Sequence, residues 1–143
     1  MDGIDGLPNL LARLQKMEQR LDPSGLNQPL TRAGLVALKA AADRIDVEGP
    51  GWPARKRYYS TPMLHRTGRL LRSLTANASG NVFDVQGSTV EVGTNVRYAR
   101  YLQTGTSRMP PRPYLFIDEA VAERVRAIFA KYVMTGDTNA GNV

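Results

Sequence analysis

Apolar residues recur at helical spacing in three long segments of the chain. One stripe runs through residues 8–21, a second runs from about residue 29 to residue 45, and a wider apolar face covers residues 118–134. We predict a helix for each segment, and we expect Phe129 in the last one to be a core residue. The first two stripes indicate a core or a subunit contact rather than a ligand site. The first stripe consists of Leu7, Leu10, Leu11, Leu14, Met17 and Leu21.

Shorter elements are predicted between the second and third helices. Thr67 is positioned to cap a short helix over residues 69–75, which would turn its leucines inward and leave Arg69 and Arg72 outside. Residues 82–85 and 89–92 alternate in a way that predicts a β-hairpin ended by Gly93, with Asp84 and Glu91 facing solvent. Residues 96–103 follow as a helical turn. Three prolines make residues 104–113 an extended loop.

These elements predict a single α+β domain over residues 1–134. We expect a small antiparallel sheet with the long C-terminal helix packed on it. Residues 1–46 form the helical N-terminal part, and proline and glycine make residues 47–66 an extended loop. The Gly-, Asn- and Thr-rich residues 135–143 are predicted to be a flexible tail.

Composition narrows the chemistry that this chain of 143 residues can perform. It has no cysteine, which excludes disulfides and cysteine nucleophiles, and His65 as the single histidine removes most zinc sites. No motif supports His65 as a catalytic residue, so we expect neither an enzyme nor a cofactor. The apolar runs are too short for a membrane span, and Asp2 and Asp5 argue against a secretory leader.

Positive charge is concentrated in residues 53–112, which hold ten basic residues, nine of them arginine, and two acids. Arginine suits bidentate contacts, so this stretch can meet an acidic protein or DNA, or it can be a solvated face. Trp52 and Tyr58 beside arginines suggest interface anchors, although Trp52 can equally fold back onto the core. The candidate interface residues are Trp52, Arg55, Arg57, Tyr58, Arg66, Arg69, Arg72, Arg108 and Arg112.

Four motifs in order resemble the phage virion morphogenesis family. They cover roughly residues 48–133, with Tyr114 and Pro111 where phenylalanine and alanine are commoner in the family. The motifs are Glu48-Gly49-Pro50-Gly51-Trp52-Pro53 with Leu64-His65-Arg66-Thr67-Gly68-Arg69-Leu70, Val92-Gly93-Thr94 with Tyr98-Ala99, Gln103-Thr104-Gly105-Thr106, and Pro111-Arg112-Pro113-Tyr114-Leu115.

The resemblance implies a structural subunit of the head–tail junction that completes the tail. Such subunits form a ring, expected to be a hexamer, which joins a head-closure or connector protein to the tail terminator or tail tube. Its implied location is the virion neck, with the host cytoplasm during assembly and no membrane. Phage DNA would pass through the ring. The alternative function, suggested by the basic charge of residues 53–112, is a nucleic-acid-binding protein that contacts DNA in or near the channel. The motif residues with implied structural roles are Thr67, Gly68, Gly93, Tyr98, Ala99, Gly105 and Pro113.

Two motif features have competing explanations. Pro111 and Pro113 would hold Arg112 on a stiff backbone for docking, or Arg112 would form a buried ion pair with an acid such as Glu119. Gly68 and Gly105 are explained by backbone geometry rather than by phosphate binding, since no Gly-rich nucleotide loop is present in the sequence.

Overall fold

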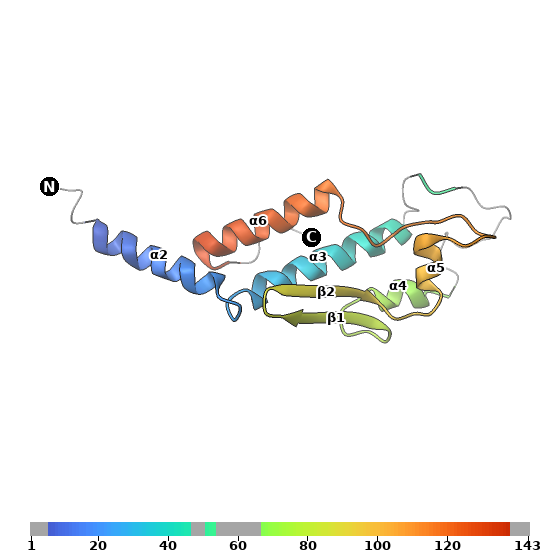
Figure 1. Cartoon of the computed structure of the whole chain (residues 1–143), viewed down its shortest axis with the longest axis horizontal. Helices are drawn as coiled ribbons and strands as arrows, with labels where there is room; N and C mark the ends of the chain where they lie inside the picture. Colours follow the sequence, from blue (N-terminus) through green and yellow to red (C-terminus); the bar gives the residue numbers. More distant parts are fainter. Residues whose placement is uncertain (1–5, 47–50, 54–66, 138–143) are drawn as a thin grey trace.

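The computed structural model describes residues 6–46, 51–53 and 67–137. Helices and one hairpin follow each other in the order that the apolar pattern predicts, and the α+β class is confirmed (Figure 1). Most boundaries move by one to three residues from those expected. The elements are α2 (Leu7–Leu21), α3 (Asn27–Asp46), α4 (Arg69–Ser73), β1 (Asn81–Gln86), β2 (Thr89–Thr94), α5 (Ala99–Thr104) and α6 (Glu119–Thr135).

Helix α3 is the centre of the fold, because it lies between the hairpin and α6 (Figure 1). Leu38 and Ile45 on α3 pack with α4, α5 and Tyr114 in one buried cluster, whereas Val36 packs with Val121 and Ile128 of α6 in another. The expectation that α6 packs on the sheet is therefore wrong. Helix α3 lies between α6 and the sheet and packs one face against each.

A glycine allows α3 to approach the hairpin closely. A Cβ built at Gly34 would lie 2.9 Å from the ring of Phe83 and 3.0 Å from Val90. In the hairpin, Phe83 pairs with Val92 and Val85 with Val90, so these side chains share the face that α3 covers. Asp84 and Glu91 pair on the opposite face and are exposed, as predicted, and β2 continues one residue past Gly93.

Helix α2 extends beyond the rest of the molecule (Figure 1). None of its residues is buried, and its five leucines each expose about half of their surface. Its C-terminal end is held by α6: Arg20 donates a hydrogen bond to the Val133 carbonyl (2.8 Å), and the Tyr132 hydroxyl donates one to the Gly25 carbonyl just after α2 (2.6 Å). The leucine stripe is thus not part of the core. Of the two roles expected for it, core or subunit contact, the subunit contact remains.

Helix α6 buries a narrower face than its sequence suggests. Val121, Ile128 and Tyr132 are buried, whereas Phe129 is only partly buried, so the expectation that Phe129 is a core residue is wrong. One turn of helix separates Val121, Val125 and Ile128 along the stripe facing α3, and Phe129 lies beside that stripe. Of the predicted tail, residues 138–143 lie outside the described residues.

Candidate assembly surface

The irregular segment of residues 105–118, which we call the strap, connects α5 to α6 across the C-terminal end of α3 (Figure 1). Gln103 holds the strap by its side-chain amide. Its carbonyl accepts from the backbone N–H groups of Tyr114 and Leu115 (both 3.1 Å), and its NH2 donates to the Leu115 carbonyl (2.7 Å). Because one side chain satisfies three backbone groups, the strap has a defined path without being a strand.

Arg44 at the end of α3 holds the other half of the strap. Its buried guanidinium donates to the carbonyls of Tyr114 (3.0 Å) and Phe116 (2.9 Å) and pairs with the Asp118 carboxylate (2.9 Å). The guanidinium also stacks on the Phe116 ring, 3.7 Å from its centroid. Arg44 could not be recognised from the sequence, because two of its three acceptors are backbone carbonyls, which have no sequence signature.

Asp118 joins this contact to the start of α6. Its carboxylate accepts from the Val121 backbone N–H (2.9 Å) as the helix N-cap. That hydrogen bond, followed by the one from Arg44, holds the pKa of Asp118 below its ordinary value. The carboxylate is therefore charged at neutral pH, where it stabilises both the cap and Arg44.

A reciprocal pair of hydrogen bonds, which we call the clasp, joins residues 51–53 to the strap. The Trp52 indole N–H donates to the Pro113 carbonyl (2.9 Å), and the Arg112 guanidinium donates to the Pro53 carbonyl (3.1 and 3.3 Å). Trp52 is partly buried and packs against the core, which is the second of its two expected roles. Arg112 is buried with a backbone partner, whereas Glu119 pairs with Arg126, so the alternative of an ion pair between Arg112 and Glu119 is wrong.

Tyr114 is buried beneath the strap. Removal from water, followed by the influence of Tyr98, raises the pKa of its phenol to about 12. Among the described residues, its hydroxyl has one long hydrogen bond, to the Ala99 carbonyl (3.5 Å). The side chain thus contributes chiefly as an apolar ring, which a phenylalanine would also supply.

The motif glycines have backbone roles in the structure. Gly105 has φ +77°, and a Cβ there would lie 2.8 Å from the nitrogen of Pro111, so only glycine fits where the strap begins. Gly68 has φ +69° and is the N-cap of α4. Thr67, which was predicted to be the cap, precedes this N-cap by one residue. Its hydroxyl accepts a hydrogen bond from the Arg69 N–H (3.4 Å). Gly93 and Ala99 are buried, while Tyr98 and Pro113 are exposed.

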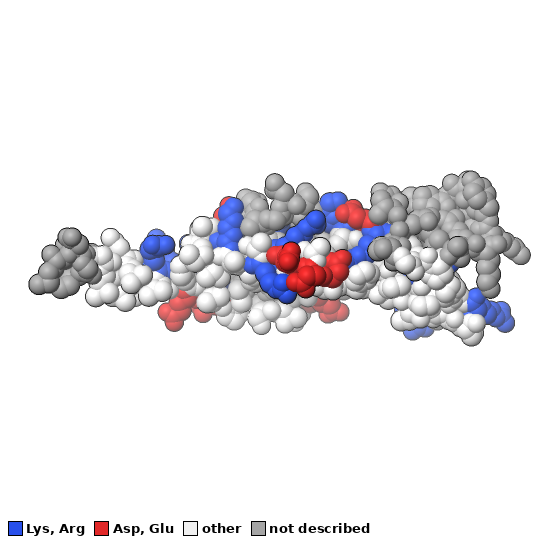
Figure 2. All heavy atoms as spheres, turned by 90° about the horizontal axis from the view of Figure 1, so that it is seen from above, with Lys and Arg blue, Asp and Glu red and all other residues white. Residues whose placement is uncertain are grey.

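Exposed arginines surround α4 and α5, which lie at the same end of the molecule (Figure 1). We call this set the arginine end. In Figure 2 the visible basic side chains at that end have no acidic neighbour in view, whereas acids and bases intermingle at mid-length. Arg100 stacks on exposed Tyr101 (4.7 Å to the centroid) and donates to its hydroxyl (2.7 Å). The arginine end consists of Arg69, Arg72, Arg97, Arg100 and Arg108.

Only part of the predicted interface set therefore comes together at this end. Arg69, Arg72 and Arg108 are exposed there, whereas Trp52 and Arg112 form the clasp inside the subunit. The remaining four candidates, Arg55, Arg57, Tyr58 and Arg66, lie outside the described residues.

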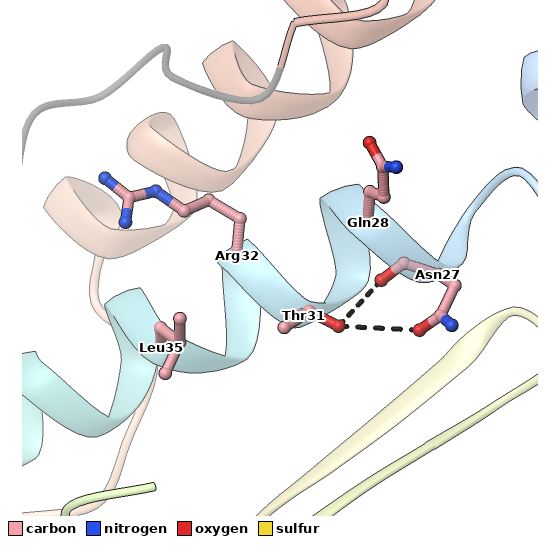
Figure 3. A pocket seen from close by; sticks show the side chains of 5 residues that line it. All are labelled: Asn27, Gln28, Thr31, Arg32 and Leu35. Carbon is pink, nitrogen blue, oxygen red and sulfur yellow. Dashed lines mark hydrogen bonds between the residues drawn. The ribbon is translucent and has the colours of Figure 1, made fainter.

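A pocket of about 320 Å³ lies along α3 and is lined by residues of that helix (Figure 3). Its Thr31 hydroxyl is used within the helix, donating to the Asn27 carbonyl (2.8 Å), and within the described part of the chain the buried Nε of Arg32 lacks a hydrogen-bond partner. Polar groups from different elements do not converge here, unlike in a built ligand site.

Within the described residues, no cluster of three or more histidines and acids is arranged to bind a metal ion. No helix within residues 6–46, 51–53 and 67–137 is long and apolar enough to cross a bilayer.

Comparison with known proteins gives one match. A sequence model of the phage virion morphogenesis family matches residues 7–134, which include every described helix and strand except the last residue of α6. No match was found among curated proteins or among solved structures.

Proposed function

The chain belongs to the phage virion morphogenesis family, and on this premise we propose that it is a ring-forming subunit that completes the tail at the head–tail junction. The family establishes a structural role in building a phage particle. Our proposal adds the place and the partners: a head-closure or connector protein on one side, and the tail terminator or tail tube on the other. We expect no catalytic role.

The observation that carries the proposal is the amount of interaction surface that the single subunit leaves open. Five leucines of α2 are half-exposed, and the arginine end lies at the opposite end of the elongated molecule (Figure 1). Single exposed apolar residues are ordinary, but a continuous stripe on a soluble monomer marks an interaction site. Different surfaces at opposite ends suit a subunit that binds neighbours on two sides.

The chemistry of the arginine end favours an acidic protein partner. Its arginines alternate with Tyr98 and Tyr101, and arginine and tyrosine are enriched at the centres of protein interfaces. The clasp and the strap hold α5 against α3, so this surface is preorganised and loses little entropy on docking.

Complementation of a defective phage tests the proposal. A phage lacking this gene should accumulate separate heads and tails, and the purified chain should join them into infectious particles. Cryo-EM of those particles should locate the chain between head and tail. Wild-type particles without the chain at that joint would overturn the proposal.

A second function, DNA binding, is favoured by the unbalanced charge of the arginine end. Titration of the purified chain with duplex DNA at increasing salt separates the two functions. Tight binding with a steep salt dependence would favour a nucleic-acid-binding protein, because each neutralised phosphate releases counterions. An assembly subunit should bind free duplex weakly.

A further inference from the structure

The open face of α2 has the spacing of a coiled-coil seam. Leu7, Leu10, Leu14, Met17 and Leu21 are separated by three, four, three and four residues. This places them at alternating a and d positions over two heptads, with Leu11 widening the seam at e. A helix that simply covered its own domain would bury this face, but no residue of α2 is buried.

We infer that the leucine face of α2 packs in parallel against α2 of a second copy of this chain. This inference deepens the proposed function and rests on its claim that copies of the chain assemble with one another. Heptad spacing fits another helix better than a sheet or a nucleic acid, because each a and d side chain inserts between four side chains of a facing helix.

The charges beside the seam specify the second copy and its direction. Arg13 lies at g and Glu18 at e, and both are exposed. In a parallel pair, Arg13 of each copy faces Glu18 of the other, giving two ion pairs. An antiparallel pair would instead bring the arginines at g together, where like charges repel. Within the described residues, neither Arg13 nor Glu18 has an ion-pair partner in its own subunit.

The area of the face agrees with this pairing. The five half-exposed leucines of α2 together present apolar surface on the order of several hundred Å². This area is at the upper end of the apolar patches that monomers expose. Two such faces together approach the ~1,000 Å² that a specific interface needs. A contact of two heptads is weak by itself, so we expect other contacts between copies in the assembled particle to reinforce it.

Cysteine cross-linking of the full chain tests the seam and its direction. The chain has no cysteine, so a Leu14→Cys variant carries one thiol at an a position, which meets its own copy in a parallel pair. Mild oxidation should give a covalent dimer. Ala12→Cys, on the outer face of the same helix, is the matched control and should remain monomeric. Failure of Leu14→Cys to cross-link, or equal cross-linking of Ala12→Cys, would overturn the inference.

Charge reversal provides an independent readout in solution. By sedimentation, Arg13→Glu or Glu18→Arg alone should weaken self-association roughly three- to tenfold, and an equal mixture of the two variants should restore it. Association of each single variant equal to that of the wild type would indicate antiparallel pairing, in which either exchange replaces one like-charge pair by another, and would overturn the inference. Melting temperatures should match the wild type, because these side chains are exposed.

Failure of the inference differs from failure of the proposed function. If the particle contains the chain at its joint but Leu14→Cys does not cross-link, only the α2 pairing is wrong. If Leu14→Cys cross-links but the particle lacks the chain, the pairing stands and the placement in the particle is wrong.

Discussion

At the scale of single residues, the side chains that fix the strap act on backbone carbonyls. Arg44, Arg112 and Trp52 each donate to a carbonyl more than fifty residues away in the sequence. Every residue offers such an acceptor, so no spacing in the sequence could pair these donors with their partners. The sequence therefore suggested Trp52 and Arg112 as interface candidates, with a buried role as the alternative for each, and it did not single out Arg44. The motif of residues 111–115 lies within the strap.

Asp118 should make stability depend on pH in the acidic range. Its pKa is lower in the folded chain than in the unfolded chain, so its stabilisation is complete above the ordinary value and is lost as pH falls through the folded pKa. Asp118→Asn keeps a cap acceptor for the Val121 N–H but removes the charge. We expect it to unfold at lower denaturant concentration than the wild type at pH 7, and the difference should shrink below about pH 4. A constant difference across this range would contradict the role of the charge.

Tyr114 should act at the opposite end of the pH scale. Because burial raises its pKa to about 12, the unfolded chain ionises first, and stability falls as pH rises from the ordinary phenol pKa towards 12. Tyr114→Phe removes this titration and loses the 3.5 Å hydrogen bond to Ala99. Chemical denaturation should give near-equal stabilities at pH 7 and a more stable variant at pH 11. Parallel curves for the two proteins would show that the phenol is hydrated in the folded chain.

At the scale of elements, the helices and the hairpin could be predicted because they depend on the local periodicity of apolar residues. The hairpin follows from alternation between neighbours, and its register places Phe83, Val85, Val90 and Val92 on one face. The layer order was not predictable, because both faces of α3 read as apolar or small. Gly34 and the alanines of α3 let the hairpin and α6 approach from opposite sides.

Neighbouring positions of α6 should respond very differently to truncation. Ile128 is fully buried against α3, so Ile128→Ala should lower the free energy of unfolding by about 2–5 kcal/mol. Phe129 is only partly buried, and Phe129→Ala should cost about 1–2 kcal/mol. Urea denaturation followed by circular dichroism measures both values. A larger loss at Phe129 than at Ile128 would mean that α6 is rotated about its axis.

At the scale of the whole molecule, the arginine end should matter for assembly and not for folding. The double variant Arg69→Glu with Arg72→Glu changes two exposed side chains, of which that of Arg72 donates to the carbonyls of Gly68 (3.3 Å) and Thr67 (3.5 Å). Joining of heads to tails should fall at least tenfold, while the melting temperature stays within about 3 °C of the wild type.

The matched control carries the same charge change on α6, where acids and bases intermingle. Arg124→Glu with Arg126→Glu breaks one exposed ion pair with Glu119, a contact of low energetic value. Particle joining should remain near the wild-type level. Equal losses in both double variants would show that net charge, rather than the arginine end, governs joining.

The clasp also gives the subunit an internal optical probe. Trp52 is the single tryptophan of the chain, and its indole bonds directly to the strap. Ultraviolet emission excited at the indole band therefore reports on this junction alone, without labels. A red shift of the emission during mixing with partner proteins would reveal that water reaches the indole. The time course of this shift would show whether water enters before or after the particle closes.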